Sequence, residues 1–173
     1  MLYTEAKRYL LAKLKAAGLK SKPYTTQKSL EKSLESHIGA VIFERESYAR
    51  NGSKKRFRDE EGAKHKRRRI FDRDVTFVVT IGDYTDEAVE SMLEQFVSSL
   101  DAGFLVDGNF VPVVVEGADW VDKDDSILKA QVAVQVSITF RGGIYRDTDF
   151  GPLSRVELTG LDKKTGKENT DVD

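Results

Sequence analysis

Few residues in this sequence have the type and spacing that catalysis requires. The chain has two histidines, His37 and His65, and no cysteine. Neither histidine has a serine or a carboxylate at a recognisable catalytic spacing, and no glycine-rich loop follows the pattern of a phosphate-binding or dinucleotide-binding fold. No set of residues supplies nucleophile, base and orienting group together, so the sequence predicts a protein that is not an enzyme.

Metal chemistry has equally little support. With no cysteine and only two histidines, the sequence lacks most of the side chains that bind transition metals. The acidic groups Asp59-Glu60-Glu61 and Asp124-Asp125 have oxygen ligands suited to a hard cation. They stand beside many lysines in stretches that we expect to be solvated loops, so we interpret them as surface charge. We therefore expect no metal and no cofactor.

The strongest chemical feature is a basic segment over residues 50–69. From Arg50 to Arg73 there are eleven Lys or Arg and four Asp or Glu, while the whole chain has a formal net charge of −1. A basic island on an otherwise acidic chain indicates contact with something acidic. Its candidate interface residues are Lys54, Lys55, Arg56, Arg58, Lys66, Arg67, Arg68 and Arg69.

Three interpretations of this segment stay open: a protein-contact arm, a nucleic-acid contact, and a plain solvated loop. Arginine suits a protein contact because its planar fork holds a carboxylate with two hydrogen bonds. Phosphates would also attract the cations, but Phe57 is the one aromatic residue available for base stacking. In structure, residues 48–69 are either a long hairpin extension or a mobile loop. With little to bury, we expect residues 50–69 to be mobile in the free protein and to become ordered at an interface.

A strand over residues 128–140 organises the predicted fold. Every even position from Leu128 to Phe140 is apolar, and the odd positions are mostly polar. A period of two places all the apolar side chains on one face of a strand. We expect it to be the longest strand, ended by Gly142-Gly143, and to need a sheet beside it and a layer above it.

Helical periodicity marks residues 2–17 and 86–100, and more weakly 26–36. Thr85 is the expected N-cap of the helix over 86–100. We expect the apolar stripe of this helix to cover the long strand. The predicted contact places Met92, Phe96 and Val97 against Val132, Val134 and Val136.

Shorter strands are predicted at 37–43, 70–81 and 111–116. The fold class is therefore α+β: a single, largely antiparallel sheet of about four strands with helices packed on one face, and a long basic loop between the first two strands. The organisation of the chain follows from the same pattern. We expect an N-terminal helix at 1–22, a core domain at 23–147 with a basic insertion at 48–69, and a polar C-terminal tail at 148–173.

A resemblance to a known family rests on three quoted stretches. They read HIGAVIFERESYARNGSKKRFRD, then RRRIFDRDVTFVVTIGD, then GNFVPVVVEGADWVDKDDSILKAQVAVQVSITFRGGIY. In this order, with a helix between the second and third, they resemble the tail terminator (tail completion) proteins of long-tailed bacteriophages over Ser36 to Tyr145. The motif residues are Ala118-Asp119-Trp120 and the closing Phe140-Arg141-Gly142-Gly143. The first helix and the tail after Asp147 lie outside the resemblance.

The resemblance implies a structural protein of the virion. Such a protein forms a homo-oligomeric ring, typically a hexamer, that caps the tail tube and offers a surface to the head connector. The implied partners are other copies of the chain, the tail tube protein and the head–tail connector protein, with DNA only as passing cargo. The first residues carry lysines among their leucines and lack the uncharged run of a signal peptide, and no stretch is apolar enough for a membrane span. We therefore expect a soluble protein, found in the host cytoplasm during assembly and afterwards at the head–tail interface of the virion.

Overall fold

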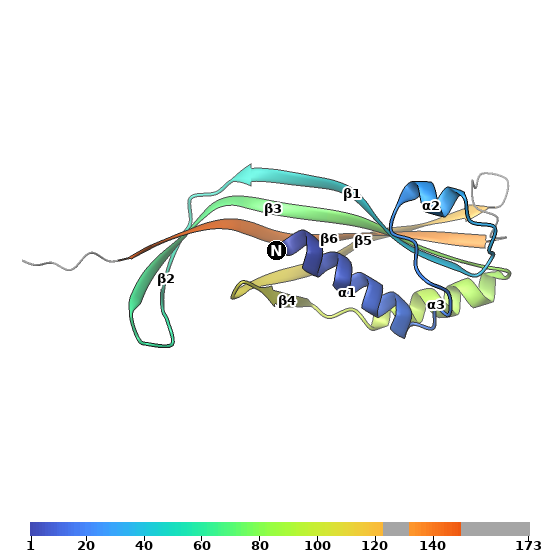
Figure 1. Ribbon diagram of the computed structural model, residues 1–173, viewed down its shortest axis with the longest axis horizontal. Helices are drawn as coiled ribbons and strands as arrows, with labels where there is room; N and C mark the ends of the chain where they lie inside the picture. The colour runs from blue at the N-terminus through green and yellow to red at the C-terminus, as the bar shows by residue number, and fades with distance from the viewer. Residues whose placement is uncertain (123–131, 150–173) are drawn as a thin grey trace, which may run out of the picture.

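The structure is a computed structural model, which describes residues 1–122 and 132–149 (Figure 1). Within these residues the chain forms three helices and six strands. The helices are α1 (Leu2–Ala16), α2 (Gln27–Glu31) and α3 (Asp86–Ser98). The strands are β1 (Ile38–Arg50), β2 (Lys54–Arg58), β3 (Lys64–Asp83), β4 (Gly103–Val106), β5 (Asn109–Asp122) and β6 (Val132–Asp149).

A long antiparallel hairpin forms one half of the sheet. β1 and β2 follow one another along β3, which pairs with β2 at its beginning and with β1 afterwards. The hairpin turns at residues 59–63, where the backbone N–H of Gly62 donates to the carbonyl of Asp59 over 3.1 Å. Gly62 has a φ of 85°, in the left-handed region that glycine adopts without steric cost. The turn thus reverses the chain between two strongly basic strands.

β6 joins this hairpin to the rest of the sheet. The strand order is β1-β3-β6-β5-β4, with β2 on the same side of β3 as β1, and neighbouring strands are antiparallel. β6 pairs with β3 along its whole described length, from Asp83↔Val132 to His65↔Asp149. β3 and β6 therefore run through both ends of an elongated molecule (Figure 1).

The main core lies where α1 and α3 pack on the sheet. Leu10 of α1 and Phe96 of α3 are fully buried with Phe77 of β3 and Phe140 of β6. The Oγ1 of Thr85 accepts a hydrogen bond from the Ala88 N–H and caps α3, as its sequence position predicts. The core thus brings the first and the last described elements of the chain, α1 and β6, into one cluster.

A smaller cluster lies on the opposite face of the sheet. Leu30 of α2 packs there with Ile38 and Ala40 of β1 and with Ala133 of β6. Because Ala133 alternates with the core residues on either side of it, this cluster lies on the face that α1 and α3 leave uncovered. Helices therefore lie on both faces of the sheet.

The predicted fold class is wrong. The sheet has six described strands rather than about four, just over half of the described residues lie in strands, and the helices are not confined to one face. Of the two alternatives for the basic segment, the structure has the hairpin extension: the expected long basic loop is the extended end of the β2–β3 hairpin. The expectation of a loop failed because it rested on the basic segment itself, which has little apolar surface to bury. Its β3 strand is paired instead with β6, whose residues come much later in the chain.

The expected long strand is also shifted. Residues 128–131 lie outside the described part of the chain, and β6 continues through both glycines to Asp149, so Gly142-Gly143 does not end it. The longest described strand is β3, with 20 residues. Gly142 serves a close approach instead, since a Cβ there would lie 2.5 Å from Leu2 Cδ2 of α1.

Candidate functional site

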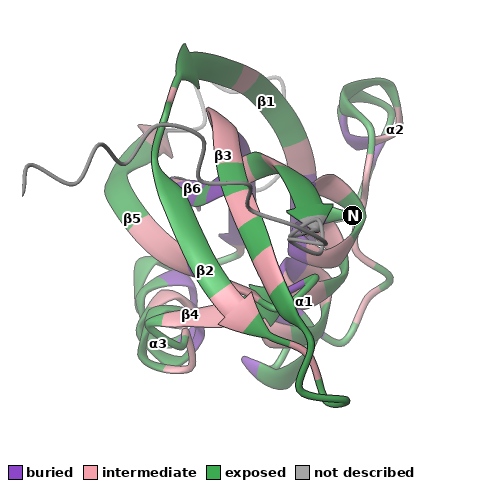
Figure 2. Cartoon of the chain, turned by 90° about the vertical axis from the view of Figure 1, so that its left-hand side faces the viewer, coloured by how far each residue is buried: buried purple, intermediate pink, exposed green. Residues whose placement is uncertain are grey.

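The basic segment forms an arm that projects beyond the helices, built from residues 53–69 and 145–149 (Figure 1). Figure 2 views the molecule from the end at which the arm lies. Side chains alternate across a strand, so the pairing register decides which of them share a face. The register pairs Lys54 with Arg68, Arg56 with Lys66, and Arg68 in turn with Arg146. One face of the arm, the cationic face, therefore collects Lys54, Arg56, Arg58, Lys64, Lys66, Arg68 and Arg146.

The cationic face consists of like charges placed directly opposite one another. Lys54, Arg68 and Arg146 form a row across three neighbouring strands, and Arg58 stands opposite Lys64. Neighbouring strands lie about 4.8 Å apart, and like charges in this position destabilise a sheet by roughly 0.2–1 kcal/mol per pair. The arm therefore carries an internal electrostatic cost that an acidic partner would relieve.

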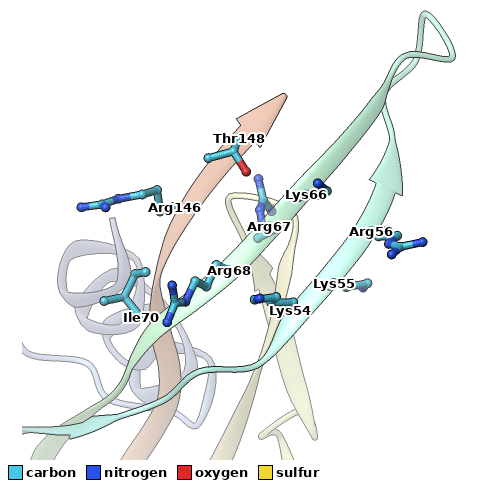
Figure 3. Close-up of a pocket in the computed structure, with 9 residues that line it drawn as sticks. All are labelled: Lys54, Lys55, Arg56, Lys66, Arg67, Arg68, Ile70, Arg146 and Thr148. Atoms are coloured by element: carbon cyan, nitrogen blue, oxygen red, sulfur yellow. The ribbon is translucent and has the colours of Figure 1, made fainter. Parts of the chain in front are cut away.

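Six of these seven cations have no anionic partner among the described residues. In residues 1–122 and 132–149, no carboxylate lies within 4 Å of Lys54, Arg56, Arg58, Lys64, Arg68 or Arg146. All six side chains are exposed. A hollow of about 620 Å³ opens beside four of them, Lys54, Arg56, Arg68 and Arg146 (Figure 3). Its lining combines residues of β2, β3 and β6, among them Lys54, Arg68, Arg146, Ile70 and Thr148.

The opposite face of the arm, which we call the tied face, is bonded to the rest of the protein. It carries Lys55, Phe57, His65, Arg67 and Arg69. The Nε and Nη2 of Arg67 donate to the two carboxylate oxygens of Asp147, over 2.8 Å and 2.6 Å. The Nη1 of Arg67 donates over 3.3 Å to the backbone carbonyl of Asp107 and to Oδ1 of Asn109. The guanidinium also lies 4.9 Å from the ring centre of Phe57. One arginine thereby connects β2, β3, β6 and the β4–β5 turn.

Two further groups complete this tied face. Arg69 pairs with Asp72, with 2.7 Å from Nε to Oδ1, and donates to the carbonyl of Gly142. His65 stacks on Phe57 with ring centres 5.2 Å apart, and its Nε2 lies 2.7 Å from Oδ2 of Asp59. Ion pairs and aromatic contacts, rather than apolar burial, hold the arm in its strand conformation.

These pairings change the acidity of the carboxyl groups involved. The hydrogen bonds from Arg67 lower the pKa of Asp147, and the same contact raises the pKa of Arg67. The hydrogen bond from His65 lowers the pKa of Asp59. Asp147 and Asp59 are therefore carboxylates at neutral pH, Asp147 opposite the Arg67 guanidinium and Asp59 against the imidazole of His65.

The structure separates the eight predicted interface residues into two groups. Lys54, Arg56, Arg58, Lys66 and Arg68 lie together on the cationic face, whereas Lys55, Arg67 and Arg69 belong to the opposite face. Sequence analysis missed two members of the cationic face, Lys64 and Arg146. Lys64 lies within the same basic run, so composition could have included it, but no local signal indicates Arg146, because it joins the face through the pairing of β6 with β3.

The predicted motif residues Asp119 and Trp120 do not belong to the arm. Both are within β5, opposite Gln135 and Val134 of β6, so the expected connection at this point is strand. Trp120 is 49% exposed. Beyond Pro112, β5 pairs with β6 on one side and with no described strand on the other. The motif therefore marks an open sheet edge with an exposed aromatic ring.

The two histidines have structural partners. Nδ1 of His37 lies 2.8 Å from Oδ2 of Asp83, which ties the start of β1 to the end of β3. In the described part of the chain, no group of three or more His, Cys, Asp or Glu is arranged to hold a metal ion. Over the same residues, no helix combines the length and hydrophobicity that crossing a membrane requires.

Comparison with protein-family models found no match, and comparison with curated proteins found no significant match.

Proposed function

We propose that this protein is a structural virion protein, a tail terminator of a long-tailed bacteriophage. In this proposal its copies form a homo-oligomeric ring, a hexamer, that caps the tail tube and joins it to the head connector, with DNA as passing cargo. The proposal requires binding surfaces and no active site. The observation that carries it is the arm, whose cationic face is exposed and preformed, and in which Lys54, Arg56, Arg58, Lys64, Arg68 and Arg146 have no carboxylate within 4 Å among the described residues.

The open edge of β5 supports the same proposal. An unpaired strand edge presents backbone N–H and C=O groups to any neighbouring chain. Along this edge lie the exposed side chains of Val115 and Trp120. Aromatic side chains are enriched in the central parts of protein interfaces. A ring subunit needs exposed surfaces for its two neighbours, and the arm and the β5 edge are both available for such contacts.

The test is the mass of the purified protein at micromolar concentration, with and without tail tube protein. A ring of defined mass, or a defined cap at the tube end in electron micrographs, is the expected result. If the protein stays monomeric at every concentration and binds neither the tail tube protein nor the connector protein, the proposal fails.

Nucleic-acid binding is the second candidate, favoured by the seven cations that the register places on one face. Its test is the salt dependence of DNA binding, because phosphate contacts weaken log-linearly as salt rises. Stacking contributes little here, since Phe57 lies on the tied face against His65 and Arg67. Tight, steeply salt-dependent DNA binding, combined with a monomeric protein, would favour this candidate over the ring.

A further inference from the structure

A second surface of like charges lies on α3. The helix contains Asp86, Glu87, Glu90 and Glu94 and no Lys or Arg. Three of them, Glu87, Glu90 and Glu94, follow the spacing of one helical face, and all three are exposed. We call these three residues the acidic face.

The stability of α3 does not by itself explain why all three positions of the acidic face are glutamates. Asp86 and Glu87 lie in the first turn, where carboxylates are stabilised by the helix dipole. Glu90 and Glu94 lie beyond that turn and are spaced i,i+4, at which like charges destabilise a helix. Within the described residues, no Lys or Arg lies within 4 Å of either carboxylate. Like the cationic face, the acidic face carries an internal repulsion.

The two faces cannot meet within one molecule. The arm lies at one end of the long axis and α3 near the other, with the body of the sheet between them (Figure 1). Opposite charges at opposite ends of a rigid body favour head-to-tail contact between copies. Such a heterologous contact builds a ring when its rotation closes.

We propose that the cationic face of the arm docks on the acidic face of α3 in a second copy of this chain. The inference rests on the proposed self-association and names the surfaces that form it. Each contact would place Arg56 and Arg68 against the partner's acidic helix, where arginine forks bind carboxylates with two hydrogen bonds. Docking relieves the like-charge repulsion on both surfaces at once, which a neutral partner would not do.

The experiment exchanges charges between the two surfaces. The arm swap is Arg56→Glu with Arg68→Glu, and the helix swap is Glu90→Lys with Glu94→Lys. Each swap alone places like charges across the contact, so we expect self-association to weaken by at least about tenfold in Kd at low salt. The matched control is Lys28→Glu with Lys32→Glu, which makes the same charge change as the arm swap at exposed positions of α2 and its C-cap. The control should assemble like the wild type.

Two combinations decide the matter. A chain carrying both swaps regains opposite charges at every contact and should assemble. An equimolar mixture of the two singly swapped proteins should also assemble when the two alternate, because the two reversed surfaces then pair at one contact and the two unchanged surfaces pair at the next. Sedimentation measures the mass in each case, and circular dichroism checks that every variant is folded. Failure of both combinations to restore assembly overturns the inference.

The other outcomes separate this inference from the proposed function. If either single swap assembles like the wild type, the docking is wrong while a ring built on other surfaces stands. If the arm swap removes DNA binding and leaves assembly unchanged, the occupant of the cationic face is nucleic acid, which also overturns the docking. A wild-type protein that is monomeric at low salt and micromolar concentration contradicts the docking directly, and the tail tube mixture then tests the proposed function separately.

Discussion

The two ends of β3 belong to different environments. Near α1 and α3, alternate residues such as Val75 and Phe77 are fully buried. In the arm, Lys64, Lys66 and Arg68 are exposed, and the residues between them are only half-buried. One end is held by apolar burial, which is non-directional, and the other by directed ion pairs such as Arg67 with Asp147. A single strand can thus serve stability at one end and recognition at the other.

The largest expected effect is at the core end. Val134 is fully buried in the main core, so Val134→Asp places an unpaired charge there and should cost more than about 4 kcal/mol. We expect the variant to be unfolded by circular dichroism. A soluble Val134→Asp protein that unfolds cooperatively would contradict the described core.

The arm offers a matched pair of neighbouring arginines. Arg67→Ser removes the two hydrogen bonds to Asp147 and should lower the free energy of unfolding by about 1 kcal/mol, a value reduced because Asp147 is partly exposed. Arg68→Ser removes no contact of this kind and should change it by less than about 0.5 kcal/mol. Urea unfolding measures both. Equal effects at the two positions would show that the faces of the arm are not distinct.

A pH effect is expected where β1 passes from the core towards the arm. The hydrogen bond from Arg73 lowers the pKa of Glu46 below its ordinary value of 4.5. Because the folded-state pKa is lowered, the pairing stabilises the protein fully above about pH 4.5 and is lost as pH falls through the folded value. Glu46→Gln should therefore lose less stability between pH 7 and pH 3 than the wild type does. Parallel urea midpoints for the two proteins would contradict the pairing.

The smallest expected effect is on the cationic face. Lys54→Ser, Arg56→Ser and Arg68→Ser together remove three mutually repelling charges and no ion pair to a described carboxylate. The melting temperature should therefore stay within a few degrees of the wild-type value, although assembly is expected to be lost. A large fall in melting temperature would mean that this face, like its opposite, holds the arm together.

Local signals in the sequence predict the helices well. The spacing of leucines and alanines at residues 2–17 and the N-cap at Thr85 lie within the elements that they define, and both are confirmed by α1 and α3. The buried side of β6 is confirmed by Val134 and Val136, which lie in one core with Met92 and Phe96. Val97, predicted in the same contact, is 38% exposed and lies outside that core.

The arm could not be predicted in the same way. In a run such as Lys66 to Arg69 every residue is charged, so the period of two that identifies a strand is hidden. Its order depends on Asp147, 80 residues after Arg67, and no short window contains both. For the same reason the prediction from sequence placed Lys66 to Arg69 on one surface. In the structure Arg67 and Arg69 form ion pairs that support the fold, whereas Arg68 is exposed.

The preformed arm has a consequence for the speed of assembly. Because its strands are already paired, little backbone entropy is lost when it meets a partner, and the fixed charges can steer the encounter from a distance. The association rate constant should then be high at low ionic strength and fall as salt shortens the Debye length, about 10 Å at 0.1 M. The arm would thus set the association rate constant between copies, while the apolar groups along the β5 edge would set the dissociation rate constant.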